Sequence, residues 1–200
     1  MFVQVMEGKT NNVEALRAQM ETWRTELRPG AEDFLGVTAG VTSDGTYVAV
    51  VRFESEAAAK ANSGRPEQGE WWKATATTFD GEVTFINCPE VDTFGDGGSD
   101  DAGFVQIMTG RADRAAVKPV VDELATVLRR MRPDVLGGTV AWPGDGSFVQ
   151  TVYFTSEAEA RTNEGAAPAS DEDRAAMERL GSLMTFERFI DLSDPWLYSR

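Results

Sequence analysis

The stretch LGVTAGVTSDGTYVAVVRFESEAAAKANSG (Leu35 to Gly64) returns later in the chain as LGGTVAWPGDGSFVQTVYFTSEAEARTNEG (Leu136 to Gly165). The two stretches align without a gap at an offset of 101 residues, and 14 of the 30 positions are identical. The heptads FVQVMEG (Phe2 to Gly8) and FVQIMTG (Phe104 to Gly110) repeat in the same way. The period is far too long for a solenoid, so the sequence indicates a domain that has been duplicated in tandem.

The duplication predicts a division of the chain into three parts. We assign residues 1–88 to a first repeat, residues 89–102 to a linker, and residues 103–200 to a second repeat with a C-terminal tail. The linker is rich in glycine and aspartate and has few apolar residues, which is typical of a solvated connection. The tail contains Trp196 and Tyr198, and we expect these side chains to pack on the body of the protein or on a second chain.

Both repeats show the same order of predicted elements, because runs of β-forming residues alternate with helical periodicity. In the first repeat we predict strands at Phe2–Met6, Leu35–Thr42, Thr46–Phe53 and Glu82–Asn87, a helix at Asn11–Arg28, and a second helix that Ser55 caps and that breaks near Pro66. In the second repeat we predict strands at Phe104–Met108, Val135–Trp142, Ser147–Phe154 and Thr185–Asp191, a helix around Val117–Met131, and a second helix that begins at Ser156 and breaks around Pro168.

The order βαββαβ is that of the ferredoxin-like unit, in which both helices lie on one face of a four-stranded antiparallel sheet. The strands are apolar on both faces, and a bare apolar face of that size would promote aggregation. We therefore predict an α+β fold in which two tandem ferredoxin-like repeats pack their sheets together into one α/β barrel.

The composition excludes several classes of function. The net charge of −14 would repel phosphate backbones and anionic lipids, so we expect neither a nucleic acid nor a membrane partner. The chain has no histidine, which removes the common catalytic triads and the usual metal and haem ligands, so we expect no metal and no cofactor. The single cysteine, Cys88, and an N-terminus without a signal-peptide pattern predict a cytoplasmic protein.

With this element order, the chain resembles the dimeric α/β-barrel superfamily, in particular its antibiotic-biosynthesis-monooxygenase-like group. The runs VVRFESEAAAKAN (Val50 to Asn62) and VYFTSEAEARTN (Val152 to Asn163) also carry the resemblance. Members usually build the barrel from two chains, so the resemblance implies a monomeric pseudo-dimer here, with a further homodimer left open. Members include cofactor-independent oxygenases of polycyclic phenols and haem-degrading enzymes. The haem-degrading enzymes depend on a histidine that this chain lacks.

Strand alternation suggests which side chains face the barrel lumen. We assign Val3 to the helix layer and Gln4, Met6, Gln106 and Met108 to the lumen. A glutamine inside an apolar lumen needs a hydrogen-bond partner, because an unpaired amide there is costly. The two glutamines either bond to each other, to strand edges or to a water, or they bind a ligand.

Six further residues are candidates for the same ligand site: Arg52, Tyr153, Trp71, Trp72, Asn62 and Asn163. Arg52 and Tyr153 occupy equivalent positions and break the internal symmetry, although a plain surface ion pair would also explain the arginine. The two tryptophans could stack on a planar ligand or simply pack in the core. The two asparagines are interpreted first as helix-end residues and second as polar groups at a pocket mouth.

Three functions remain open on these observations. The first is a small-molecule-binding protein that holds a mostly apolar or aromatic ligand in the barrel lumen. The second is a cofactor-independent monooxygenase of a phenolic or polyketide-like substrate, for which the sequence offers no evident catalytic base. The third is a structural or interaction protein with a filled lumen. A cavity above roughly 300 Å³ with converging polar groups would favour the first two.

Overall fold

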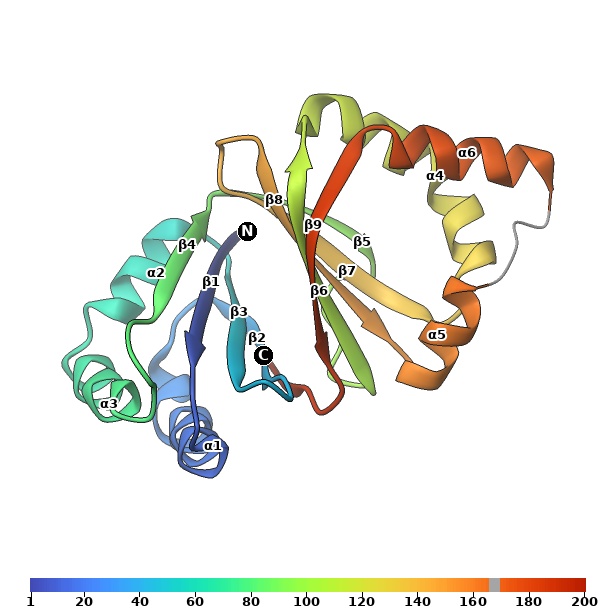
Figure 1. The fold of residues 1–200 in the computed structure, drawn as a ribbon. Helices are drawn as coiled ribbons and strands as arrows, with labels where there is room; N and C mark the ends of the chain where they lie inside the picture. The colour runs from blue at the N-terminus through green and yellow to red at the C-terminus, as the bar shows by residue number, and fades with distance from the viewer. Residues whose placement is uncertain (166–169) are drawn as a thin grey trace. The chain divides into compact units, whose positions relative to one another are not determined.

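The computed structural model describes residues 1–165 and 170–200 and divides the chain into two compact units (Figure 1). The first unit contains residues 1–90 together with residues 194–200, and the second unit contains residues 91–193. The helix break predicted around Pro168 lies outside the described residues.

The first unit has the predicted βαββαβ order with irregular additions. Its elements are β1 (Phe2–Lys9), α1 (Val13–Thr22), a π-helical turn η1 (Trp23–Leu27), a 3₁₀ turn η2 (Arg28–Gly30), β2 (Phe34–Val41), β3 (Thr46–Phe53), α2 (Glu56–Ser63), α3 (Pro66–Ala76), β4 (Thr84–Cys88) and the C-terminal β10 (Trp196–Ser199). Ser55 caps α2 by accepting a hydrogen bond from the Ala58 backbone N–H, as its sequence pattern predicts. Pro66 starts α3, where its missing N–H costs nothing.

The five strands of the first unit form one antiparallel sheet in the order β10-β2-β3-β1-β4. Helices α1, α2 and α3 lie on one face of this sheet (Figure 1). Apolar side chains of the sheet and the helices form the core between them, with Phe2 and Met6 of β1 packed in the same cluster as Leu16, Trp23 and Ala59.

This packing reverses the predicted orientation of β1. Phe2 and Met6 face the helices, so Gln4, which alternates with them, also lies on the helix-covered face, and Val3 points to the opposite face. The alternation of side chains along a strand correctly groups the residues that share a face, but it does not say which face meets the helices. The larger side chains pack against the helices, where they fill the space between the layers.

The second unit repeats this architecture. Its elements are β5 (Glu90–Gly95), β6 (Phe104–Ala112), α4 (Arg114–Met131), β7 (Val135–Trp142), β8 (Ser147–Phe154), α5 (Glu157–Glu164), α6 (Asp171–Gly181) and β9 (Met184–Leu192). The sheet order is β5-β7-β8-β6-β9. Phe104 and Met108 of β6 cluster with Ala160 of α5, so Gln106 and Met108 face the helices. The sequence-based prediction, which placed both on the opposite face, is wrong.

The predicted linker and tail both contribute a strand. Part of residues 89–102 forms β5 and pairs with β7 of the second unit, so this stretch is not wholly irregular. The tail forms β10, whose Trp196 and Tyr198 pair with Ala39 and Val37 of β2. Strand β5 follows the last strand of the first repeat in the sequence but joins the sheet of the second unit. Strand β10 follows the last strand of the second repeat but joins the sheet of the first unit. The closure of the two sheets into one barrel stays a prediction.

Candidate functional site

A cavity of about 260 Å³ lies between the helices and the sheet of the first unit. Its lining residues come from β1, β2, β3 and β4 on the sheet side and from α1, η1, α2 and α3 on the helix side: Gln4, Met6, Met20, Trp23, Val37, Val51, Phe53, Ala59, Asn62, Ser63, Gln68, Gly69, Trp71, Trp72 and Phe85. The volume falls just below the roughly 300 Å³ at which drug-sized sites begin. The cavity therefore suits a ligand of one or two fused rings.

The floor of the cavity follows directly from strand alternation. Gln4 and Met6 of β1 and Val51 and Phe53 of β3 are two residues apart on their strands, so each pair points to the same face. Gln4 lies opposite Val51 in the register of the two strands. One polar side chain therefore rises from a floor that is otherwise apolar.

An aromatic wall surrounds the cavity. The ring centroids of Trp23 and Trp71 are 6.5 Å apart, those of Trp71 and Trp72 are 6.1 Å apart, and Phe85 meets Trp72 edge-on at 5.4 Å. Trp23 donates its indole N–H to Gln68 Oε1 at 2.8 Å, and Trp71 donates to the Gln19 carbonyl at 2.8 Å. These bonds hold two of the indoles in place. The Trp72 Nε1–H donates to no residue within 1–165 or 170–200.

Three amide side chains that line the cavity, those of Gln4, Asn62 and Gln68, have hydrogen-bonding atoms without a partner in the described part of the chain. Gln4 donates from Nε2 to Asn87 Oδ1 at 2.9 Å, and its Oε1 accepts no bond from the described part of the chain. Asn62 is only 8% exposed and accepts from Arg65 Nη1 at 2.9 Å through Oδ1, while its Nδ2 makes no bond to a described residue. The unbonded atoms include one acceptor, on Gln4, and donors on Asn62, Trp72 and Gln68; Gln68 accepts from Trp23 through Oε1, and its Nε2 bonds to no described residue.

None of the described lining residues carries a charge. The nearest buried phenol in the same core is Tyr47, whose hydroxyl donates to Met20 Sδ at 3.4 Å. Burial raises the pKa of Tyr47 far above its usual value, and the nearby Tyr198 raises it further, so this phenol stays protonated. The cavity offers hydrogen bonds and apolar surface, and its described lining contains no side chain that would act as a base near neutral pH.

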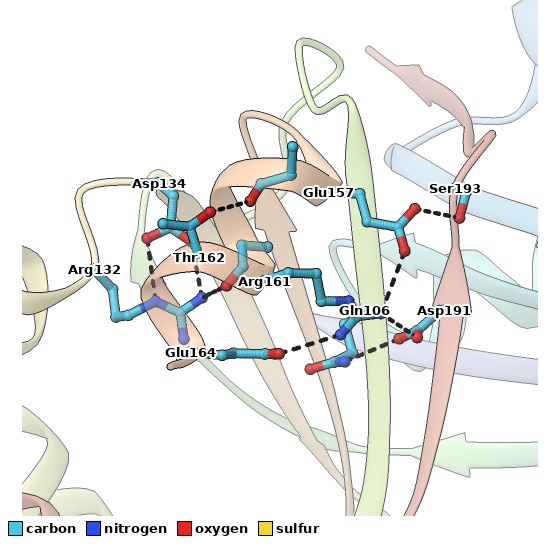
Figure 2. Close-up of polar contacts among 11 residues, drawn as sticks. Gln106, Arg132, Asp134, Glu157, Arg161, Thr162, Glu164, Asp191 and Ser193 are labelled. Atoms are coloured by element: carbon cyan, nitrogen blue, oxygen red, sulfur yellow. Dashed lines mark hydrogen bonds and ion pairs between the residues drawn. The ribbon is translucent and has the colours of Figure 1, made fainter. Parts of the chain in front are cut away.

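The corresponding place in the second unit is built from charged groups (Figure 2). Gln106 of β6 donates to Asp191 Oδ1 of β9 at 2.9 Å, and Arg161 of α5 bonds to the other oxygen of that carboxylate. Arg161 also pairs with Glu157 at 3.4 Å and Glu164 at 3.3 Å. Desolvation lowers the pKa of Arg161, but Asp191 and Glu164 together more than offset it and raise the pKa, so the charge is permanent.

The structure brings together half of the residues that the sequence suggested for one site. Gln4, Met6, Asn62, Trp71 and Trp72 line the cavity. Their counterparts Gln106, Met108 and Asn163 belong to the second unit, and the two glutamines do not bond to each other, because each has a partner in its own unit.

Arg52 and Tyr153 lie away from the cavity. Both are buried, at 5% and 0% exposure, and both sit on strand positions that point away from the helices. Arg52 donates to Thr38 Oγ1 at 2.9 Å. It is therefore not the exposed edge arginine that a surface ion pair would require.

The sequence did not single out four large lining side chains: Met20, Trp23, Phe53 and Phe85. Met20 and Trp23 stand at helical spacing in the first helix and are easily interpreted as ordinary core. The sequence does contain a signal for this aromatic wall. Two of the helical segments that cover the sheet, α3 and the α1–η1 segment, contain three of the tryptophans.

Two kinds of feature are absent from the described residues. No group of three or more metal-ligating side chains occurs in residues 1–165 and 170–200. Within the same described ranges, no helix combines the length and the apolar character that a membrane crossing needs.

Comparison with known proteins identifies the fold. No family model and no curated protein matches the sequence. Among solved structures, the chain is similar to a protein of Lactobacillus acidophilus NCFM that is provisionally named as a monooxygenase, with 10% identity over 95% of this chain and 90% of that one and a TM-score of 0.68. A protein of Fusobacterium nucleatum subsp. nucleatum ATCC 25586, also provisionally named as a monooxygenase, shows 8% identity, coverage of 95% and 89%, and a TM-score of 0.70.

A third solved structure, of an anthrone oxidase-like protein, shares 13% identity over 98% of this chain and 89% of that one, with a TM-score of 0.59. At such identities the similarity concerns the fold and not the activity. The three matches run through both units, so the tandem arrangement is shared as well. Each unit has the ferredoxin-like βαββαβ fold, and the chain shares this fold, present in two tandem copies, with these three solved structures.

Proposed function

We propose that the first unit binds a small, uncharged, planar aromatic molecule in the cavity between its helices and its sheet. The observation that carries the proposal is a cavity walled by Trp23, Trp71 and Trp72 whose described lining has no charged side chain. Aromatic walls favour flat rings through stacking and edge contacts. An anion or cation would lose its hydration there without an ionic partner. This place differs from the barrel lumen in which we first expected the ligand.

The polar atoms without a partner further restrict the chemical groups that the ligand should carry. Asn62 Nδ2 and Trp72 Nε1 would donate to a carbonyl or hydroxyl oxygen, and Gln4 Oε1 would accept from a hydroxyl. Leaving these atoms unpaired beside an apolar ligand would cost binding energy. A ring system with at least one oxygen substituent therefore satisfies the site better than a plain hydrocarbon.

A cofactor-independent monooxygenase is the second candidate function. Its support is the fold shared with two proteins named provisionally as monooxygenases and with an anthrone oxidase-like protein. In such a reaction the substrate would lose its hydroxyl proton to water or buffer, because the described lining holds no base, and the resulting anion would give an electron to oxygen while the donors of Asn62 and Trp72 stabilise its charge. Oxygen consumption with naphthalene-1,4-diol, whose two fused rings match the size of the cavity, tests this activity when it is measured against the rate without protein, and its absence would leave ligand binding as the function.

Calorimetric titration with 1-naphthol tests the binding proposal. This probe is uncharged at neutral pH, is planar, and carries one hydroxyl group. We expect a saturable heat of binding and a rise in melting temperature, because a ligand that binds only the folded state stabilises it. The matched control is 1-naphthoate, which has the same two rings and a negative charge: its charge should prevent binding at the same concentrations.

The variant Gly69→Leu locates the binding. A Cβ atom at Gly69 meets nothing within 4 Å, and leucine also forms helix better than glycine, so the substitution should fill the cavity without destabilising α3. Gly181→Leu is the control, because Gly181 ends α6 in the second unit and its Cβ would also meet nothing. We expect at least a tenfold loss of affinity in the first variant only. Equal binding by both would contradict the proposed place.

A further inference from the structure

The two units carry equivalent side chains with different chemistry at one corner of the helix-covered face. Gln4 pairs across the sheet with Asn87 in the first unit, and Gln106 pairs with Asp191 in the second. At the offset of 101 residues, Lys60 of α2 is the equivalent of Arg161 of α5. Three substitutions therefore separate the two corners: lysine to arginine, asparagine to aspartate, and serine to glutamate, since Ser63 is the counterpart of Glu164.

In the first unit this corner stays neutral. Lys60 turns away to pair with Glu56 at 2.7 Å, and its side chain is 75% exposed. Gln4 and Asn87 share one uncharged hydrogen bond of 2.9 Å. Nothing ties α2 to β4 through these side chains, and Gln4 lines the cavity.

In the second unit Arg161 spans the corner (Figure 2). Its guanidinium lies over the Phe104 ring at 5.1 Å and binds the Asp191 carboxylate, which links α5 to β9. Glu157 and Glu164 hold the same guanidinium from within α5. Gln106, whose counterpart borders the cavity, is only 6% exposed and is bonded to Asp191.

An apolar ligand would have to break this network to reach Gln106. It would separate a half-buried ion pair and a cation–π contact, and it would replace them with nothing of equal strength. The helix wall is different too, because α6, the last helix of the second unit, contains no aromatic residue where α3 has Trp71 and Trp72.

We propose that Arg161 and Asp191 close the second unit's counterpart of the cavity, so that each chain binds one ligand molecule and binds it in the first unit. The proposal rests on the proposed function. It makes the two repeats unequal: the first keeps an open neutral site, and the second uses the same position to tie a helix to its sheet.

Transplanting the closing pair into the first unit tests this proposal. The double variant Lys60→Arg/Asn87→Asp places both charged groups on exposed positions, so the fold should be retained, as its melting temperature will show. We expect wild type to bind one equivalent of 1-naphthol in calorimetry and the double variant to bind at least tenfold more weakly. The controls are the single variant Lys60→Arg and the double variant Lys60→Gln/Asn87→Asp. Each should keep its affinity within about threefold, because the first lacks the carboxylate and the second lacks the cation.

The outcomes separate the two proposals. Two equivalents bound by wild type, or undiminished binding by a folded double variant, would overturn the closure by Arg161 and Asp191 and leave the proposed function standing. A loss of binding in either control variant as large as in Lys60→Arg/Asn87→Asp would also overturn it, because the pair would then not be the cause. Absence of any binding by wild type would overturn the proposed function and this inference together.

Discussion

Gln4 and Gln106 stand in the same sequence motif and make the same kind of bond, yet their surroundings differ. Gln4 bonds to Asn87, which is exposed and can exchange its partner for water. Gln106 is buried and bonds to Asp191, whose carboxylate also holds Arg161. The hydrogen bond of Gln106 therefore supports an ionic network, whereas that of Gln4 leaves an acceptor free in the cavity.

Replacing each glutamine separately should show this difference in stability. Gln106→Leu leaves one carboxylate oxygen of Asp191 without its buried donor, so we expect a loss of about 1–3 kcal/mol in the free energy of unfolding. Gln4→Leu should cost less than about 1 kcal/mol, because water can satisfy Asn87. Urea denaturation of both variants measures the two values. A larger loss for Gln4→Leu would show that the two environments have been assigned wrongly.

Single positions were only partly predictable from the sequence. A glutamine between apolar residues marks a polar group in need of a partner, and this signal correctly identified Gln4 as unusual. The pattern could not name Asn87 as the partner, because the pairing depends on the register between β1 and β4. The difference between Arg52 and its counterpart Tyr153 also suggested Arg52 for the site. Arg52 lies on the other face of its strand, and a difference between repeats does not reveal the face to which a side chain points.

Strand β5 shows how a segment without a strand pattern can still join a sheet. Asp92 on this strand accepts two hydrogen bonds from Arg114 of α4, at 2.8 and 2.9 Å, and one from Trp142 of β7 at 2.9 Å. The side chain of Asp92 is 21% exposed. The strand is held by this anchor and by the free edge of β7, and neither is visible in the glycine- and aspartate-rich sequence.

The Asp92 anchor should make stability depend on pH. The hydrogen bonds from Arg114 lower the pKa of Asp92, burial opposes this, and the Trp142 bond lowers it further. Because the folded-state pKa lies below the unfolded one, the stabilisation is complete above about pH 5 and is lost as the pH falls through the folded value.

Asp92→Asn should therefore destabilise the protein by about 2 kcal/mol at pH 7, and the difference from wild type should shrink below about pH 4. Urea denaturation at a series of pH values gives both curves. Asp96→Asn, on an exposed residue directly after the same strand, is the matched control and should show no comparable change. A constant difference between wild type and Asp92→Asn down to pH 3 would rule out the ionised anchor.

The longer elements were predictable because their patterns are local. Strands β3, β7 and β8 have the boundaries that the sequence predicts, and the break between α2 and α3 falls just before Pro66. The tail strand β10 was missed as a strand because four residues show too little alternation. It exists because β2 offers an open edge and because Trp196, 3% exposed, packs into the first unit's core.

Duplication gave this chain two copies of one architecture, and the copies now differ at the position that would bind a ligand. The first unit has a neutral cavity with an aromatic wall, and the second has a network of charged side chains at the equivalent corner. The order of elements and the tandem fold could be inferred from the sequence. The inequality of the two copies could not, because it depends on where Arg161 and Lys60 direct their charges.

The indole N–H resonances of the five tryptophans provide the most direct test of the cavity as a binding site. Trp23, Trp71 and Trp72 line the cavity, whereas Trp142 lies in the second unit and Trp196 does not border the cavity. In a two-dimensional proton–nitrogen spectrum titrated with 1-naphthol, we expect the three cavity indoles to shift with one common saturation curve and the other two to stay in place. Saturable shifts confined to Trp142 or Trp196, with the three cavity indoles unchanged, would contradict the account.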